Sequence, residues 1–443
     1  MNPNPPVAPS FMEALRFWLK LGFIGFGGPA GQIAIMHTEL VERRRWISEQ
    51  RFLHALNYCM LLPGPEAQQL ATYIGWLLHR SWGGIVAGVL FVLPSLFIVI
   101  ALSWVYLRFG DQPLVAGLFY GLMPAVVALV LHAVYRIGSR ALRRRWQWAL
   151  AALSFVALFA LGLPFPLIVL GAGLIGWLGA RHAPALFDAP AGHVAAQAGY
   201  GPALIDDDTP TPPHARFSKS RLLRVLAIGI GLWATAMGLL VATLGWQHDL
   251  SQMGWFFTKT ALFSFGGAYA VLPLVYQGAV EHYQWLSGEQ MVHGLALTQA
   301  TPGPLIMVVV FVAFVGGWQQ QLFGPDALFA AAATAAFLVC FFTFLPSFVF
   351  ILAGGPLVES THGRLGFTGP LTAITAAVVG VIVNLALILA WHTFWPQGWA
   401  GGLDWVSLLI ALGAVLALFR FKLGVLPLLA GCALLGLLLS LLR

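Results

Sequence analysis

Long apolar runs alternate with short polar breaks along almost the whole chain. The runs are repeatedly about 20 residues long, the length a helix needs to cross roughly 30 Å of hydrocarbon. They lack the strict alternation of apolar and polar positions that membrane β-strands show. One segment departs from this pattern: residues 61–76, LLPGPEAQQLATYIGW, hold two prolines, a glutamate and a Gln-Gln pair in otherwise apolar sequence. The pattern predicts an all-α integral membrane protein in which some helices are broken by polar sequence.

Composition and charge agree with a membrane protein. The 443 residues are 59% hydrophobic and 9% charged, whereas an ordinary globular domain is roughly 25% charged. The net charge of +7 is concentrated in short arginine clusters at 43–45 and 143–145. The positive-inside rule explains such clusters, so no nucleic-acid partner is expected. Cys59, Cys340 and Cys432 lie scattered in apolar segments without metal-ligand spacing, so no metal site and no cofactor are expected.

The chain is a duplication. Equivalent motifs fall on each other at a shift of 239 residues: Phe26-Gly27-Gly28 on Phe265-Gly266-Gly267, Pro63-Gly64-Pro65 on Pro302-Gly303-Pro304, and Lys20 on Lys259. After an insertion in the second copy the match resumes at a shift of 252, where LPS at 93–95 falls on LPS at 345–347. Residues kept in both copies are thereby marked as important.

Four segments follow from this duplication. The first membrane repeat is assigned to residues 1–180 and the second to residues 247–443. Between them lie a hydrophilic linker at 181–221, rich in Pro, Ala, His and Asp and expected to be flexible, and an extra apolar span at 222–246. One extra crossing would let the second copy enter the membrane upside down, as in inverted-repeat transporters.

Loop charges favour this inversion. The loop with Arg43, Arg44 and Arg45 has a counterpart around Glu281 and His282 without Lys or Arg. Five arginines lie between positions 136 and 145, and the matching loop near residue 404 has none. Equivalent loops are therefore expected on opposite sides of the membrane.

The same rule predicts segments that enter and leave the membrane on one side. Both basic loops of the first copy lie inside if segment 52–79 enters, breaks at Pro63-Gly64-Pro65 and leaves again. The GFGGP segment at 25–29 and the SFGGA segment at 264–268 are expected to re-enter likewise. The alternative, about thirteen full crossings, violates the charge rule at a few loops.

The breaks predict an anion site. Glycine and proline there would expose the amide-bearing starts of half-helices, which carry about half a positive charge. Simple packing kinks are the alternative for one break, but four breaks in two duplicated pairs favour a substrate site. The candidate substrate-binding glycines are Gly27, Gly28, Gly64, Gly266, Gly267 and Gly303.

Two lysines add to the candidate site. Lys20 and Lys259 each precede a glycine break in apolar sequence, where an ammonium group is costly unless it faces a cavity or a counter-ion. Snorkelling to the lipid headgroups is the alternative. Because both copies retain the lysine, we expect the pair to lie near the anion path.

Three polar residues follow the first Pro-Gly-Pro break. Glu66 either complements the dipole of its own helix or exchanges a proton in step with the substrate, and Leu305 at the matching place restricts that role to one copy. Gln68 and Gln69 either donate hydrogen bonds to an oxyanion or satisfy one another.

At this point the motifs match a known family. FGGPAGQIA at 26–34, WIS at 46–48, LLPGPEAQQLATYIGW at 61–76 and the FGG, WLS and TPGP series of the second half resemble the chromate ion transporter family, in its long two-domain bacterial form. The resemblance implies a secondary transporter of the inner membrane that extrudes chromate, with sulfate as an analogue, and confers chromate resistance. The residues alone lead only to an inverted-repeat anion transporter, without a cofactor, in contact with the lipid bilayer; whether it forms a homodimer stays open.

Three other functions are alternatives. A passive anion channel, or a transporter of another oxyanion such as sulfate, would use the same half-helix starts. An intramembrane enzyme acting on a lipid phosphate would need a nucleophile and a base, and the sequence shows no HExxH, GxSxG or Walker A pattern. No catalytic residue is therefore assigned, and the protein is not expected to be an enzyme.

Overall fold

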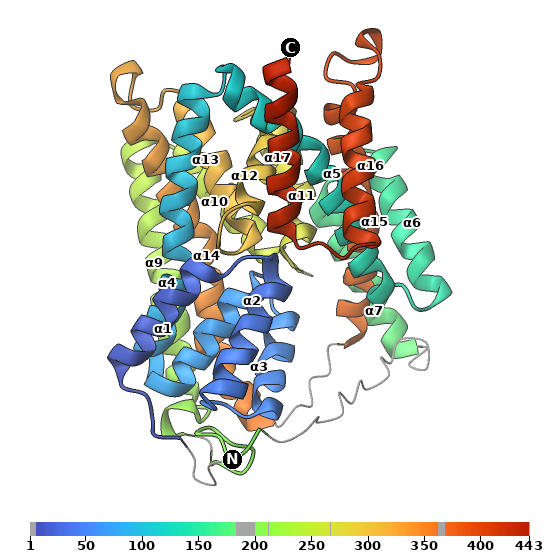
Figure 1. Ribbon diagram of the computed structural model, residues 1–443. Coiled ribbons are helices and arrows are strands. Elements are labelled where there is room, and N and C mark those ends of the chain that lie inside the picture. The colour runs from blue at the N-terminus through green and yellow to red at the C-terminus, as the bar shows by residue number, and fades with distance from the viewer. Residues whose placement is uncertain (1–5, 183–199, 211, 266, 362–367, 443) are drawn as a thin grey trace.

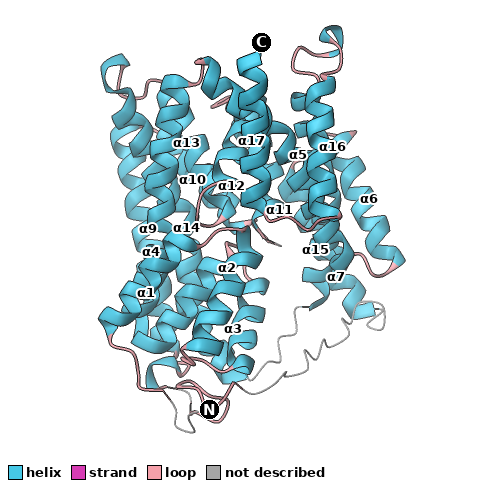
Figure 2. Ribbon diagram, in the orientation of Figure 1, coloured by secondary structure: helices cyan, strands magenta, loops and turns pink. Residues whose placement is uncertain are grey.

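The computed structural model describes residues 6–182, 200–210, 212–265, 267–361 and 368–442 (Figure 1). Within these residues the chain is helical and has no β-strand (Figure 2). Seven of the described helices are long and apolar enough to cross a membrane. The prediction of an all-α integral membrane protein is confirmed.

The order of helices in the first copy recurs in the second. The first copy contains α1 (Phe11–Ile24), α2 (Gly28–His37), the π-helix η1 (Thr38–Arg43), α3 (Glu49–Leu61), α4 (Glu66–Phe109), α5 (Pro113–Ala141), α6 (Arg145–Phe159) and α7 (Phe165–His182). The second contains α10 (Asp249–Leu262), α11 (Ala268–Tyr276), the π-helix η3 (Gln277–His282), α12 (Gly288–Gln299), the 3-10 turn η4 (Leu305–Met307), α13 (Val308–Gln319), α14 (Leu328–Thr361), α15 (Thr368–Phe394), α16 (Trp405–Phe419) and α17 (Val425–Leu442). Even the π-helix is repeated, and α9 (Lys219–Leu244) lies between the copies, where the extra span was expected.

Helix α4 consists of two parts, which correspond to two separate helices in the second copy. His79 and Arg80 have non-helical dihedral angles, and Arg80 has a φ of 57°. The first part therefore corresponds to α13, and the long remainder corresponds to α14. In the second copy a short loop and the 3-10 turn η5 (Pro325–Ala327) stand at this place.

The short helices of the two copies lie on opposite sides of the molecular middle. In Figure 1, α1, α2 and α3 lie in the lower half, whereas α10, α12 and α13 lie in the upper half. These helices have 10 to 14 residues, so at 1.5 Å per residue none of them crosses 30 Å of hydrocarbon alone. This arrangement agrees with segments that re-enter, while the inverted orientation in the membrane stays a prediction.

Two equivalent hydrogen bonds join the copies at this middle level. The amide of Gly64 donates to the carbonyl of Ser264 over 3.1 Å, and the amide of Gly303 donates to the carbonyl of Gly25 over 2.9 Å. The shift of 239 residues relates the two bonds, because it carries position 25 to 264 and position 64 to 303. Each Pro-Gly-Pro break is therefore hydrogen-bonded to the glycine-rich break of the other copy.

The ends of the two copies also exchange partners. Helix α17 packs on α5, where a Cβ at Gly121 would come within 2.0 Å of the carbonyl oxygen of Cys432. Helix α7 packs on α15, where a Cβ at Gly176 would come within 2.6 Å of the carbonyl oxygen of Gly369. Small residues permit such close helix contacts in membranes. The last helix of each copy thus belongs to the packing of the other copy.

These contacts define two groups of helices. The core group contains α1 to α4, α9, α10, α13 and α14, the flanking group contains α5 to α7 and α15 to α17, and α11 and α12 lie between the two groups. Helices α6, α7, α15 and α16 of the flanking group lie on the right in Figure 1. The two groups meet where α11 and α12 contact α5 and α15.

The later part of the linker packs on the first copy. Ile205 forms an isolated bridge with Ile47. The guanidinium of Arg51 donates to the carbonyls of Asp206 and Thr209 and also pairs with Glu359 of α14 over 2.6 Å. The expectation of a flexible linker is therefore corrected for residues 200–210; residues 183–199 and 211 lie outside the described chain.

The first prediction concerns topology. Arg43 and His282 occupy equivalent exposed positions, because 43 and 282 differ by 239. Single cysteines at these two positions are expected to react with a membrane-impermeant maleimide from opposite faces, Arg43→Cys from the cytoplasmic side. Reaction of both positions from the same side would refute the inverted repeat.

The second prediction concerns the exchanged helices. Gly121→Ala forces α5 away from the backbone of α17 and should lower the free energy of unfolding by about 1–3 kcal/mol. Thermal unfolding in detergent measures the loss. Gly431→Ala on α17 is the matched control, because a Cβ at Gly431 meets nothing within 4 Å. An equal change in both variants would contradict the close contact.

Candidate functional site

Two half-helices begin at the middle level without a side-chain cap. Gly27 precedes α2 with a φ of 85°, and Gly267 precedes α11 with a φ of 92°. Glycine adopts this left-handed region without a steric penalty. Among the described residues no side chain caps either helix start. No side chain therefore competes with a ligand for the first-turn amides, and that these glycine breaks bind the substrate stays a prediction.

A large cavity leads to these helix starts from the arginine-rich loops. It has a volume of about 1020 Å³ and lies between α2 and α3 on one side and α5 and α6 on the other. The exposed residues Arg140 and Arg143 line its mouth, and Pro29, Glu66 and Gly267 line it further in. The cavity thus has a positively charged entrance.

A second cavity meets the first at three residues. It has a volume of about 230 Å³, and its lining includes Gly28, Gln299 and Gly303. Pro29, Arg136 and Tyr269 line both cavities, and we call these three residues the junction. The start of α2, the start of α11 and helix α5 therefore come together at one place.

Arg136 is the cation at the junction, although the sequence identifies it only as one of five arginines between positions 136 and 145. The structure places it inside α5 (Pro113–Ala141), one helical turn before Arg140. Within the described chain its guanidinium makes no hydrogen bond, and no carboxylate lies within the 4.0 Å of an ion pair. In the sequence, Arg136 stands in an otherwise apolar segment ahead of the cluster at 143–145. This isolated position is the feature that could have marked it as a functional residue.

Glu66 lies at the first residue of α4 and lines the first cavity. Its Oε1 is 3.6 Å from the place where a Cβ of Gly267 would be. The carboxylate therefore lies beside the start of α11, in the same cavity as Arg136. Burial opposes ionisation of this carboxyl group, whereas the helix start and the arginine favour it.

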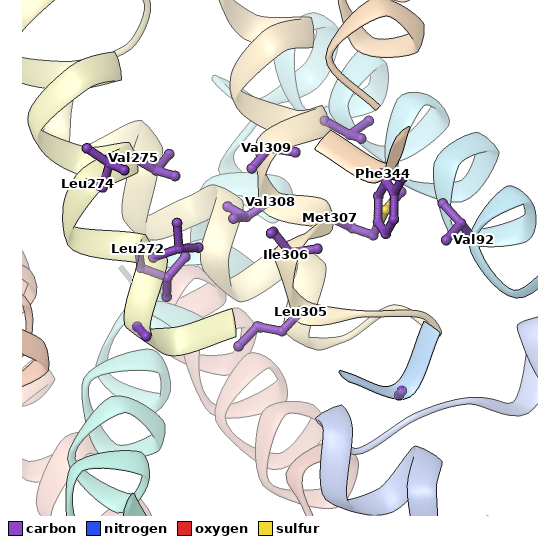
Figure 3. Packing of buried hydrophobic residues seen from close by; sticks show 14 of the residues in the cluster. Val92, Leu272, Leu274, Val275, Leu305, Ile306, Met307, Val308, Val309 and Phe344 are labelled. Atoms are coloured by element: carbon purple, nitrogen blue, oxygen red, sulfur yellow. The ribbon is translucent and has the colours of Figure 1, made fainter. Parts of the chain in front are cut away.

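The equivalent break in the second copy is apolar. Figure 3 shows Leu305, Ile306 and Met307 in a hydrophobic cluster with Leu272 and Phe344. Leu305 stands where the first copy has Glu66. Only the first break therefore places a titratable group at the site.

The glutamines after the first break donate hydrogen bonds to neighbouring groups of the first copy. Gln69 Nε2 donates to the carbonyl of Pro63 over 2.7 Å, and Gln68 Nε2 donates to Thr72 Oγ1 over 3.1 Å. Both side chains are fully buried and line none of the three cavities described here. Gln32, which the sequence analysis missed, donates to the carbonyls of Gly25 and Gly303 at 2.9 and 2.6 Å.

The glycines of the Pro-Gly-Pro breaks have equivalent surroundings. Gly64 has a φ of 125° and packs on Ser347, whereas Gly303 has a φ of 109° and packs on Ser95. In each case an added Cβ would come within 2.4 Å of the serine side chain. Gly303 also lines the second cavity, so only one of the two glycines borders the site.

The predicted lysines lie apart from the junction. Lys20 is exposed on α1, and the ammonium of Lys259 lies 5.6 Å from the ring centroid of Trp255. Neither lysine lines one of the three cavities. Their place near the anion path stays a prediction, and Gly266 lies outside the described residues.

A third cavity approaches from the opposite end of the molecule. It has a volume of about 1090 Å³, and its lining includes Asp111, Glu289 and His293. His293 contacts Tyr106 OH at 2.9 Å and Met123 Sδ at 3.2 Å. No residue lines both this cavity and the second one. The junction is therefore connected to the arginine-rich side and separated from the other side.

Comparison with known proteins identifies the family. The chromate transporter family model matches residues 12–177 and 251–437. A chromate transport protein of Cupriavidus metallidurans is 30% identical over 98% of both chains, and one of Pseudomonas aeruginosa is 32% identical over 87% of this chain and 82% of its own. No solved structure matches. The chain therefore belongs to the chromate transporter family, a family of transporters and not of enzymes, and is a multi-pass protein of the bacterial inner membrane.

Proposed function

We propose that this protein is a secondary active transporter that exports chromate from the cytoplasm and thereby confers chromate resistance. Sulfate, a tetrahedral dianion like chromate, is expected to compete. One observation carries the proposal: Arg136, Glu66 and two uncapped helix starts surround the inner end of a cavity with an arginine-lined mouth. The names of the relatives, which are chromate transport proteins, support the choice of substrate.

The charges of the first cavity favour anion entry from the cytoplasm. Arg140, Arg143 and Arg144 line it, and the positive-inside rule assigns these loops to the cytoplasmic face. A cleft of one charge sign raises the local concentration of ions of the opposite sign. Substrate would therefore collect at the cytoplasmic end of the path.

The membrane potential can drive export without nucleotide hydrolysis. Moving one elementary charge through 100 mV is worth about 2.3 kcal/mol, so a dianion that leaves a negative interior gains about 4.6 kcal/mol per 100 mV. This free energy favours outward movement of chromate. A site that faces the two sides in turn would let the dianion use this free energy, and coupling to protons or to a counter-anion would make the transport secondary active.

Glu66 gives this site a coupling to protons. An ionised Glu66 and a dianion both carry negative charge and lie in the same cavity as Arg136. The carboxylate therefore opposes anion binding, and its protonation removes the repulsion. Protonation of Glu66 therefore favours binding of the anion near Arg136, and binding of the anion favours protonation of Glu66.

Movement between the two helix groups would change access to the junction. The first cavity separates α2 and α3 of the core group from α5 and α6 of the flanking group. The third cavity lies at the opposite end of the same boundary, beside α5 and α12. Closing the first cavity while opening the third would expose the junction to the other side, as alternating access requires.

The third prediction tests transport and coupling together. Inside-out vesicles with the protein are expected to take up radiolabelled chromate, and an imposed proton gradient should change the rate. Glu66→Gln should retain uptake and lose the response to the gradient, because amide and acid are alike in size while the amide does not titrate. Glu281→Gln, at the place equivalent to position 42 and outside the three cavities, is the control and should respond as the wild type does.

Three results would contradict the proposal in different ways. A gradient response that persists in Glu66→Gln would remove this residue from the coupling. Flux that responds to neither protons nor a counter-anion would indicate a passive channel. Absence of chromate uptake, with sulfate uptake intact, would assign the protein to another oxyanion.

A further inference from the structure

The geometry points to a single tetrahedral-dianion site at the junction, formed asymmetrically by Arg136 and the start of α2 from the first copy and by Gln299 and Tyr269 from the second. This inference rests on the proposed function for the class of substrate. It goes beyond that function by naming the ligands, and it predicts one ion for each chain although the chain is a duplication.

The duplication provides two equivalent places where an anion could bind. Polar side chains are present at only one of them. At the equivalent positions the other copy has an apolar residue in every case: Ile388 for Arg136, Ala30 for Tyr269, Met60 for Gln299 and Leu305 for Glu66. The order of helices recurs in the two copies, whereas the side chains at these four positions do not. Because polar side chains stand at only one of the two places, we expect one site for each chain.

Gln299 is the strongest sign of a ligand. It is the last residue of α12, its exposed fraction is 9%, and it lines the second cavity. Its Oε1 accepts a hydrogen bond from Tyr269 OH over 3.2 Å. Its buried Nε2 has no partner among the described residues. A buried amide donor without a partner is unfavourable, so a ligand that accepts its hydrogen bond would stabilise this arrangement.

Tyr269 connects Gln299 to the junction. It is the second residue of α11 and lines both cavities. Because the Tyr269 hydroxyl donates a hydrogen bond to the oxygen of the Gln299 amide, the NH₂ group of that amide remains free to donate to a ligand. Tyr269 is therefore a positioning residue that fixes the direction of the amide.

Arg136 and α2 supply the remaining donors. The guanidinium of Arg136 presents five N–H groups in a planar fork, which can bind two oxygens of one anion. Helix α2 has 10 residues and starts at Gly28 beside the second cavity. Its amides and its dipole favour negative charge at this end.

These groups favour a fully deprotonated dianion as the ligand. Arg136, Gln299 and the amides of α2 are all donors, and a tetrahedral ion such as chromate or sulfate offers four acceptor oxygens pointing in different directions. Nitrate has one charge and three oxygens in a plane, so it can satisfy fewer of these donors. We therefore expect sulfate and chromate to compete with each other and nitrate to compete weakly.

The fourth prediction tests the site by equilibrium binding. The purified full chain in detergent is titrated with radiolabelled sulfate, and unlabelled chromate and nitrate are the competitors. The wild type should bind one sulfate per chain. Arg136→Gln and Gln299→Leu should each weaken binding about tenfold or more, because each removes a donor from a charge-assisted hydrogen bond. Arg136→Lys keeps the charge without the fork and should lose less.

Arg224→Gln is the matched control. Arg224 is exposed on α9 and lines none of the three cavities. Its variant removes the same charge and should bind sulfate within about twofold of the wild type, since exposed charges are screened by salt. Thermal unfolding of each variant without anion shows whether it is folded; Gln299→Leu, which only removes a buried amide, keeps the test valid should Arg136→Gln be unstable.

The outcomes separate this site from the proposed function. Loss of binding in Arg136→Gln and Gln299→Leu, but not in Arg224→Gln, supports the site even if vesicles show no response to protons. Binding as in the wild type in both folded variants overturns the site and leaves transport untouched. Two sulfate ions per chain overturn the asymmetry, and a wild type that binds no dianion overturns the site and the choice of substrate together.

Discussion

Backbone amides inside a membrane need hydrogen-bond partners, and this constraint shapes the centre of the molecule. A broken helix leaves amides and carbonyls without partners in a layer that contains no water. Here Gly64 and Gly303 donate to Ser264 and Gly25 of the opposite copy. Each copy thus satisfies backbone groups of the other, and the breaks can persist at a depth where a single copy would leave them exposed to hydrocarbon.

Once the backbone is satisfied in this way, the side chains are free to differ. The first break places Glu66 in a cavity, whereas the second places Leu305 in the hydrophobic cluster. The arginine of α5 likewise has an isoleucine, Ile388, as its counterpart. A repeated order of helices therefore carries an asymmetric set of charges.

Much of the frame could be predicted from the sequence, because it follows from apolar length, Gly and Pro positions and a detectable repeat. The recurrence of Phe-Gly-Gly and Pro-Gly-Pro located the helix breaks, and Glu66 was recognised as a group present in one copy. Arg136, Tyr269 and Gln299 were missed for a physical reason: retention in both copies marks residues that hold the shared backbone, and these three have no polar counterpart. The docking of the linker was missed because Arg51 binds carbonyl groups there, and no sequence pattern encodes a carbonyl partner.

The exchange of end helices has a consequence for biosynthesis. Gly117 and Gly121 of α5 face Ser440 and Gly436 of α17, which are synthesised much later. Helix α5 therefore enters the bilayer before α17 exists and can pack against it only after α17 has been inserted. A chain without α17 would lack the surface on which α5 packs, so insertion of a helix of the second copy determines whether a helix of the first copy is packed.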